Sequence, residues 1–133
     1  MYCLDNTNGT ILWSYQCPSS PYALESCPGI DVKNIYFGDP QGYFYCLDRI
    51  TGKEVWKKKI SEKIINSSPL VIRDKVFVGC FDYNFYALDK ATGKVLDKFV
   101  THGSIYGSPI VIGDEIIVPD YDSNVYILRS KGK

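Results

Sequence analysis

The chain has 133 residues, of which 45% are hydrophobic and 23% charged, a balance that excludes a disordered chain and fits one modest globular domain. Fifteen basic residues balance fifteen acidic ones, so no long-range field favours a nucleic acid or an anionic membrane as partner. No apolar run reaches the roughly 18–20 residues of a membrane span and no signal peptide is visible, so a cytoplasmic protein is expected, or an extracytoplasmic one if the chain is a piece of an exported protein.

The first predicted element lies in residues 1–16, where the sequence YCLDNTNGTILW contains Asp5, Gly9 and Trp13. A short apolar run precedes a polar turn, and Thr10–Tyr15 follows it as a second predicted strand. This segment therefore resembles half of a larger repeating unit that the rest of the chain shows in full.

Two complete units follow in residues 26–60 and 67–100, and a third, shortened unit occupies 107–133. Equivalent positions recur roughly every 40–43 residues, as from Asp5 to Asp48 and on to Asp89. Residues 1–133 are thus interpreted as one domain built from four blade parts.

Each complete unit contains four predicted strands. In the second complete unit they are Pro69–Ile72, Lys75–Cys80, Asn84–Asp89 and Val95–Val100, and in the last unit Pro109–Ile112, Glu115–Val118 and Asn124–Arg129. Short runs rich in Val, Ile, Phe and Tyr, separated by Gly, Asp and Asn turns, predict antiparallel meanders and no helix. A four-stranded meander repeated at this period predicts an all-β fold, a β-propeller of which this chain holds about three and a quarter blades.

The recurring stretch YCLDRITGKEVWKKK crosses from the third strand of a blade to the fourth. Asp48 is expected to accept hydrogen bonds from turn N–H groups, Thr51 to add a hydroxyl, and Gly52 to supply a positive φ. Trp56 is expected to fill the space between blades while its N–H finds a carbonyl. Turn closure and packing account for all of these residue types. The complete set of predicted structural motif residues is Asp5, Gly9, Trp13, Asp48, Thr51, Gly52, Trp56, Asp89, Thr92 and Gly93.

The motif A/C-L-D-x-x-T-G-K-x-x-W resembles the tryptophan-docking repeat of the pyrroloquinoline-quinone (PQQ)-type propellers. This resemblance implies a propeller fold in a family that holds quinoprotein alcohol dehydrogenases and also cofactor-free proteins of outer-membrane assembly. The pattern departs from the family at Asn8, which replaces Thr, at Asp97, which stands at a docking-Trp position, and in the final ILRSKGK.

In the enzymes of this family, the resemblance implies a quinone stacked on Trp, an adjacent cysteine pair, a calcium ion and a catalytic Asp. The chain has no Cys-Cys pair, and both of its tryptophans fall at docking positions. No catalytic residue, metal ligand or cofactor is therefore predicted, and PQQ with calcium belongs only to the alternative that the chain is a fragment of a quinoprotein dehydrogenase. The lone His102 is interpreted as an exposed loop residue.

Five cysteines form no zinc-type pair, and reduced thiols are the default. A disulfide between Cys17 and Cys27 stays open. Lys57, Lys58 and Lys59 are interpreted as protection of an exposed sheet edge. A sugar- or polymer-binding surface lined by Tyr36, Tyr43, Tyr83 and Tyr121 is a further alternative.

An open arc of this size would expose two apolar blade faces, more than a soluble monomer tolerates. The sequence therefore predicts a non-catalytic scaffold for protein interaction or assembly that completes its ring with another chain. The partner is either a second copy, as a homo-oligomer such as a dimer forming a six-bladed ring, or the remaining blades of a longer protein.

Overall fold

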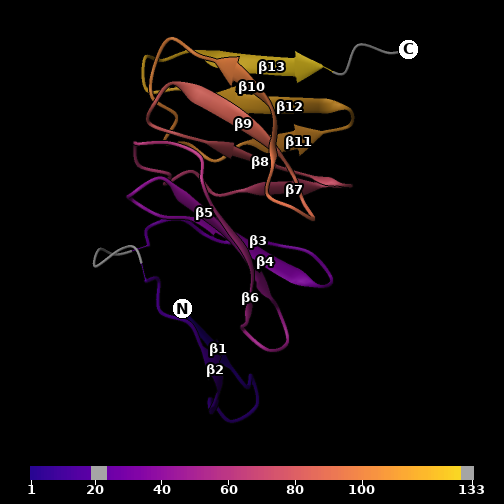
Figure 1. Cartoon of the computed structure of the whole chain (residues 1–133). Helices are drawn as coiled ribbons and strands as arrows, with labels where there is room; N and C mark the ends of the chain where they lie inside the picture. Colours follow the sequence, from indigo (N-terminus) through magenta and orange to yellow (C-terminus); the bar gives the residue numbers. More distant parts are fainter. Residues whose placement is uncertain (19–23, 130–133) are drawn as a thin grey trace.

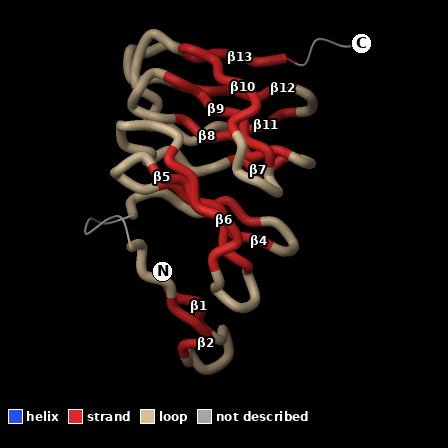
Figure 2. Tube along the Cα trace, in the orientation of Figure 1, coloured by secondary structure: helices blue, strands red, loops and turns tan. Residues whose placement is uncertain are grey.

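The computed structural model describes residues 1–18 and 24–129, which form thirteen strands and contain no helix (Figures 1 and 2). The strand bounds are β1 Tyr2–Leu4, β2 Ile11–Ser14, β3 Gly29–Ile30, β4 Asn34–Gly38, β5 Tyr43–Asp48, β6 Glu54–Lys59, β7 Leu70–Ile72, β8 Lys75–Gly79, β9 Asn84–Asp89, β10 Val95–Val100, β11 Ile110–Ile112, β12 Glu115–Pro119 and β13 Val125–Arg129. The expected all-β fold with four-stranded antiparallel sheets is confirmed.

The strands form four sheets in chain order, which are called blades 1 to 4 below. Blade 1 contains β1 and β2, blade 2 contains β3–β6, blade 3 contains β7–β10 and blade 4 contains β11–β13. Within each blade, every strand pairs antiparallel with the next one along the chain. Figure 1 shows the blades following one another from the N-terminal end to the C-terminal end.

The predicted strand ends are nearly correct. Asn84–Asp89 and Val95–Val100 are confirmed as strands, whereas Pro69 and Pro109 lie just before β7 and β11. Proline has no N–H to donate to a ladder, which explains why the paired region begins one residue later. The expected strand Thr10–Tyr15 shortens to Ile11–Ser14. The divergent end of ILRSKGK, residues 130–133, lies outside the described residues.

A register irregularity recurs where the third strand of a blade meets the fourth. In blade 2, Cys46 pairs with Trp56 and the register then shifts before Leu47, and blade 1 shifts in the same way after Cys3 pairs with Trp13. Such bulges reorient the following side chains. The tryptophan is thereby placed on the side of its strand that faces the next blade.

The hydrophobic core lies between the blades. Between blades 1 and 2, Phe37 stacks on Tyr45 with ring centroids 4.9 Å apart, and Trp13 packs against this cluster. Between blades 2 and 3 the buried cluster includes Tyr36 and Trp56. Each fully buried large side chain contributes roughly 1.5–3 kcal/mol, so adjacent blades stabilise one another.

Candidate functional site

The turn between β5 and β6 is closed by the Asp48 carboxylate. Its Oδ1 accepts hydrogen bonds from the N–H groups of Ile50 (3.0 Å) and Thr51 (2.7 Å) and from the Thr51 hydroxyl (2.8 Å). Main-chain bonds from Gly52 N to Asp48 O (2.9 Å) and from Asp48 N to Lys53 O (2.8 Å) complete the loop. The φ of +69° at Gly52 is one that other residues rarely adopt.

Blade 3 repeats this turn. Asp89 accepts from the N–H (2.8 Å) and the hydroxyl (2.6 Å) of Thr92, and Gly93 has a φ of +70°. These donors stabilise the charged form and lower the pKa of Asp48, chiefly through the N–H of Thr51, and that of Asp89, chiefly through the hydroxyl of Thr92. Both carboxylates are therefore occupied with turn closure.

The first turn reaches the same shape with different residues. Asn8 stands where the other turns have Thr, and Asp5 instead accepts hydrogen bonds from the N–H (2.8 Å) and the hydroxyl (2.5 Å) of Thr7. Asn8 Oδ1 accepts from the N–H of Thr10 (2.9 Å), and Gly9 has a φ of +75°. The departure from the repeat pattern is thus compensated locally.

Each tryptophan crosses to the turn of the following blade. Trp13 Nε1 donates to the carbonyl of Arg49 (3.2 Å), and Trp56 Nε1 donates to the carbonyl of Lys90 (3.1 Å). A Cβ added to Gly52 would lie 2.5 Å from Trp13 Cε3, which shows that the indole rests directly on the glycine. The turn of one blade therefore forms the contact surface for the indole of the blade before it.

A second set of aspartates, which the sequence interpretation missed, lies in the hairpins between the second and third strands. Asp39 Oδ2 accepts from the Tyr45 hydroxyl (2.8 Å), and Asp120 Oδ2 accepts from the Tyr126 hydroxyl (3.0 Å). In both blades the tyrosine follows six residues after the aspartate, a spacing visible in the sequence. These pairs fix the third strand to its hairpin.

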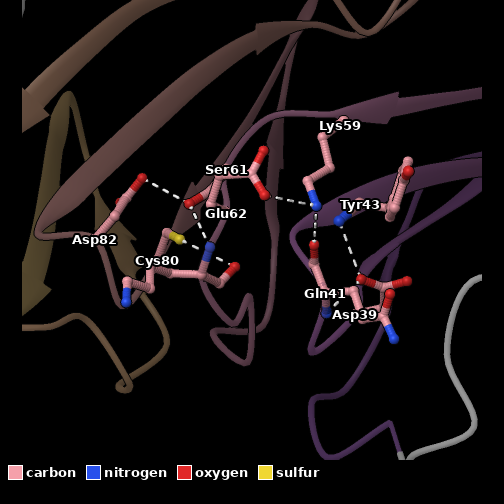
Figure 3. A network of polar contacts seen from close by, with 9 residues as sticks. Asp39, Gln41, Tyr43, Lys59, Ser61, Glu62, Cys80 and Asp82 are labelled. Carbon is pink, nitrogen blue, oxygen red and sulfur yellow. Dashed lines mark hydrogen bonds and ion pairs between the residues drawn. The ribbon is translucent and has the colours of Figure 1, made fainter.

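The hairpin of blade 3 differs, because Cys80 (Figure 3) occupies the position that Asp39 holds in blade 2 and Asp120 holds in blade 4. Asp82, two residues further on, accepts instead from the Tyr86 hydroxyl (2.5 Å) and from the Ser61 hydroxyl (2.8 Å). Although partial burial opposes ionisation, these donors lower the pKa of Asp82. The Ser61 bond also links the end of blade 2 to the hairpin of blade 3.

Lys59 stabilises the neighbouring hairpin of blade 2. Its ammonium donates to the carbonyl of Gln41 (2.8 Å) and lies 3.1 Å from a Glu62 carboxylate oxygen (Figure 3). The ammonium of Lys57 lies 4.2 Å from the centre of the Tyr43 ring. These lysines thus contribute to local structure on β6, an edge strand of its sheet.

His102 is exposed, as expected, and its Nδ1 lies 3.0 Å from the Tyr126 hydroxyl. Within residues 1–18 and 24–129, no three His, Cys, Asp or Glu side chains are grouped so as to hold a metal ion. The same described ranges contain no helix able to span a membrane.

All five cysteines are free thiols, so the disulfide between Cys17 and Cys27 that the sequence left open is not formed. Burial raises the pKa of Cys46 to about 12 and that of Cys80 to about 11. Both thiols are therefore poor nucleophiles, and they pack in the core between blades 2 and 3.

The tryptophans and the recurring aspartates, which would have to hold a quinone and a calcium ion, are not arranged to bind these ligands. Both indoles already rest on glycine turns, and the recurring carboxylates of Asp5, Asp48 and Asp89 accept hydrogen bonds from their own turns.

The four tyrosines proposed from the sequence as a sugar- or polymer-binding surface differ in burial. Tyr36 is fully buried between blades, where its ring lies 6.1 Å from that of Trp56. Tyr43 is half-buried, whereas Tyr83 and Tyr121 are exposed. The four side chains therefore do not line one surface.

The N-terminal end of the arc exposes a blade face. Tyr2 and Leu4 are 69% and 53% exposed, whereas Tyr45 and Leu47, at the equivalent positions of blade 2, are both 0% exposed. Blade 1 covers the blade 2 residues, and no described residue covers blade 1 in the same way.

The C-terminal end shows the same difference. Val125 and Ile127 are 64% and 52% exposed, while their counterparts Phe44 and Cys46 in blade 2 are both 0% exposed. Apolar positions that are buried inside the arc thus face solvent at both of its ends. The two end faces are the candidate functional surfaces of this chain.

Comparison with known proteins identifies the family to which these repeats belong. A family model described as outer membrane protein assembly factor BamB matches residues 1–133. The chain belongs to this family. A relative named outer membrane protein assembly factor BamB from Kangiella koreensis is 33% identical over 107 residues, which are 78% of this chain and 25% of that protein. A quinoprotein ethanol dehydrogenase from Pseudomonas aeruginosa is 33% identical over 108 residues, 73% of this chain and 17% of the enzyme.

Solved structures agree on the fold. The crystal structure of BamB from Moraxella catarrhalis superposes with a TM-score of 0.73 at 20% identity, covering 96% of this chain and 42% of that one. A quinohemoprotein alcohol dehydrogenase from Pseudomonas putida gives a TM-score of 0.65. The predicted PQQ-like β-propeller fold is confirmed, and the chain spans about a quarter or less of the curated relatives described here. None of these relatives supports the cytoplasmic location expected from the sequence.

Proposed function

We propose that residues 1–133 form a single, non-catalytic segment of a PQQ-like propeller that acts as a scaffold for protein interaction or assembly. In this proposal, blades outside the segment complete its ring. The name of the Kangiella koreensis relative refers to the assembly of outer membrane proteins, which supports both the assembly role and an extracytoplasmic location.

The observation that carries the proposal is the exposure of apolar residues at the two ends of the arc. Leu4 is 53% exposed where Leu47 and Leu88, at the same place in blades 2 and 3, are 0% exposed. Large exposed apolar patches mark surfaces that bind other proteins. The turns and hairpins, by contrast, use their polar groups internally and support a structural role.

Two sources could supply the missing blades: a second copy of this chain, as in a homo-oligomer, or further blades of a longer protein. A second copy would place the three strands of its blade 4 beside the two strands of blade 1. Removal of the apolar end faces from water favours either arrangement at roughly 25 cal/mol per Å² of buried apolar area.

Sedimentation velocity of the purified chain and of two end-face variants tests this proposal. Leu4→Glu and Ile127→Glu each place a charge on an end face and should abolish association. Val55→Glu is the matched control, because Val55 is similarly exposed at 51% but lies on an outer strand of a complete blade. Equal behaviour of all three variants contradicts the assignment of the end faces as interaction surfaces.

A fragment of a PQQ- and calcium-dependent dehydrogenase is the second candidate, favoured by the 33% identity to the quinoprotein ethanol dehydrogenase. Equilibrium dialysis with PQQ and calcium, read by quinone absorbance, separates the two. The scaffold proposal expects no retained quinone, and stoichiometric retention would establish the second candidate.

A further inference from the structure

A groove opens between the outer strands of blades 2 and 3, away from both end faces. It has a volume of about 510 Å³ and is lined by residues 58–60, at the end of β6, and by residues 92–95, in the turn that leads into β10. The charged side chains of this lining are Lys58, Lys59 and Lys94, and no carboxylate of the described residues belongs to it. The groove therefore combines open space with positive charge.

Two of the three ammonium groups are not used by the fold. Lys59 is occupied, because its Nζ donates to the carbonyl of Gln41 (2.8 Å) and lies 3.1 Å from a carboxylate oxygen of Glu62. Within residues 1–18 and 24–129, neither Lys58 nor Lys94 takes part in an ion pair. An anion in the groove would therefore not have to displace an existing partner of these two lysines.

The neighbouring charges on blade 3 reinforce this positive field. Lys98 pairs with Tyr86, a member of the core between blades 2 and 3, so Lys98 lies on the face of β10 that is turned towards the groove. Asp97 precedes it and lies on the opposite face. The Asp89 carboxylate accepts hydrogen bonds from the N–H and the hydroxyl of Thr92, which keep it within its own turn.

Side-chain contacts occupy the equivalent position in the two neighbouring grooves. Where blade 2 has Lys58, two residues after the tryptophan, blade 1 has Tyr15, whose hydroxyl donates to Glu54 (2.6 Å). Blade 3 has Phe99 at this position, and its ring lies 5.2 Å from that of Tyr126. The repeat thus places a lysine beside an open groove where its other copies place an aromatic contact.

We propose that the groove between β6 and the β9–β10 turn binds the phosphate group of a phosphate monoester, with Lys58 and Lys94 as its ligands. A phosphate monoester carries a charge of about −1.5 to −2 at pH 7, which two ammonium groups match, whereas a carboxylate carries a single charge. Lysine binds phosphate as a point charge. The volume of about 510 Å³ leaves space for the group that carries the phosphate. Because the groove lies outside both end faces, this inference does not depend on the proposed function.

Nuclear magnetic resonance of the isotope-labelled full chain at constant ionic strength tests the site. The probes are inorganic phosphate and glycerol phosphate, and sodium acetate is the carboxylate control. Both phosphates should shift the amide signals of Lys58, Thr92 and Lys94 saturably at millimolar concentration. Acetate should bind at least fivefold more weakly, because it offers only one negative charge.

A set of matched variants locates the contact. Lys58→Gln and Lys94→Gln each remove one ammonium group but keep most of the side-chain stem. Each should raise the Kd for inorganic phosphate about two- to fivefold, and the double variant should raise it about tenfold, because exposed ion pairs are individually weak. Lys53→Gln is the control, because Lys53 is also exposed and holds the position of Lys94 in the turn of blade 2. This control should leave the Kd unchanged.

Vesicles distinguish a lipid headgroup from a soluble ester as the source of the phosphate. Retention of the chain by phosphatidic acid vesicles, but not by phosphatidylserine vesicles of equal surface charge, and its loss in Lys58→Gln would support the site with a lipid ligand. Binding of the soluble phosphates without vesicle retention would support the site with a soluble ester.

Three outcomes would overturn the inference. They are the absence of saturable shifts at tens of millimolar phosphate, equal affinity for acetate and phosphate, and equal weakening by Lys53→Gln and Lys94→Gln. None of them bears on association through the end faces, which sedimentation velocity measures separately.

Discussion

Replacement of Trp56 by alanine should remove a buried indole from the core between blades 2 and 3. The side chain is 9% exposed, its ring lies 6.1 Å from that of Tyr36 and 6.0 Å from that of Phe44, and its N–H donates to Lys90 O. Truncation of a buried tryptophan costs about 3–5 kcal/mol. The hydrogen bond accounts for roughly 1 kcal/mol of that loss. Trp56→Phe, which loses the hydrogen bond and only part of the ring, should therefore cost less than Trp56→Ala.

Urea unfolding followed by far-ultraviolet circular dichroism measures these losses, with Trp13→Ala as the comparison. Trp13 makes the same hydrogen bond to the next turn but is only half-buried, so its loss should be roughly half as large. A loss below about 1 kcal/mol for Trp56→Ala, or a larger loss for Trp13→Ala, would refute the view that indoles lock successive blades together.

Three further predictions concern the turns and the thiols. Gly93→Ala should lower the free energy of unfolding in urea by more than about 1 kcal/mol, because the new Cβ would contact Trp56 and the alanine would have to adopt a positive φ. An unfolding free energy equal to that of the wild type would contradict this prediction. Partial burial disfavours ionised Asp31, but its Lys90 ion pair and turn N–H groups lower its pKa from 3.8 to about 2. The contribution of ionised Asp31 to the free energy of unfolding is therefore complete above about pH 4 and declines as the pH falls towards 2. Asp31→Asn should cost about 1 kcal/mol or less of unfolding free energy at neutral pH and clearly less at pH 2, where folded Asp31 is about half protonated, and an equal loss at both pH values would exclude this linkage. A thiol reagent should modify exposed Cys27 within minutes and buried Cys80 only upon unfolding, and equal rates would show that Cys80 is accessible.

The repeat period was sufficient to predict the fold, because each complete blade is built from the same four short strands. Turn residues were predictable for a local reason. The glycine four positions before the docking tryptophan, Gly52 before Trp56, predicts a tight turn, and the structure gives it a φ of +69°. Exposure was harder to predict, since Tyr36 and Tyr83 look alike in the sequence but lie in the core and at the surface.

The hairpin aspartates could not be assigned from the turn motif because they belong to a second, looser repeat. Asp39 and Asp120 hold equivalent tyrosines, whereas blade 3 places Cys80 at that position and uses Asp82. The exchange keeps the hydrogen bond but changes the spacing to the tyrosine. The aspartate–tyrosine hydrogen bond, and not the sequence position of the aspartate, is preserved at these hairpins.

The molar mass of the purified chain at micromolar concentration, measured by multi-angle light scattering, tests most directly whether the end faces require partners. An arc with apolar faces at both ends predicts a mass above the 15.0 kDa of one chain, because association removes these faces from water. A stable 15.0 kDa monomer, with no association as the concentration rises, would contradict the central claim.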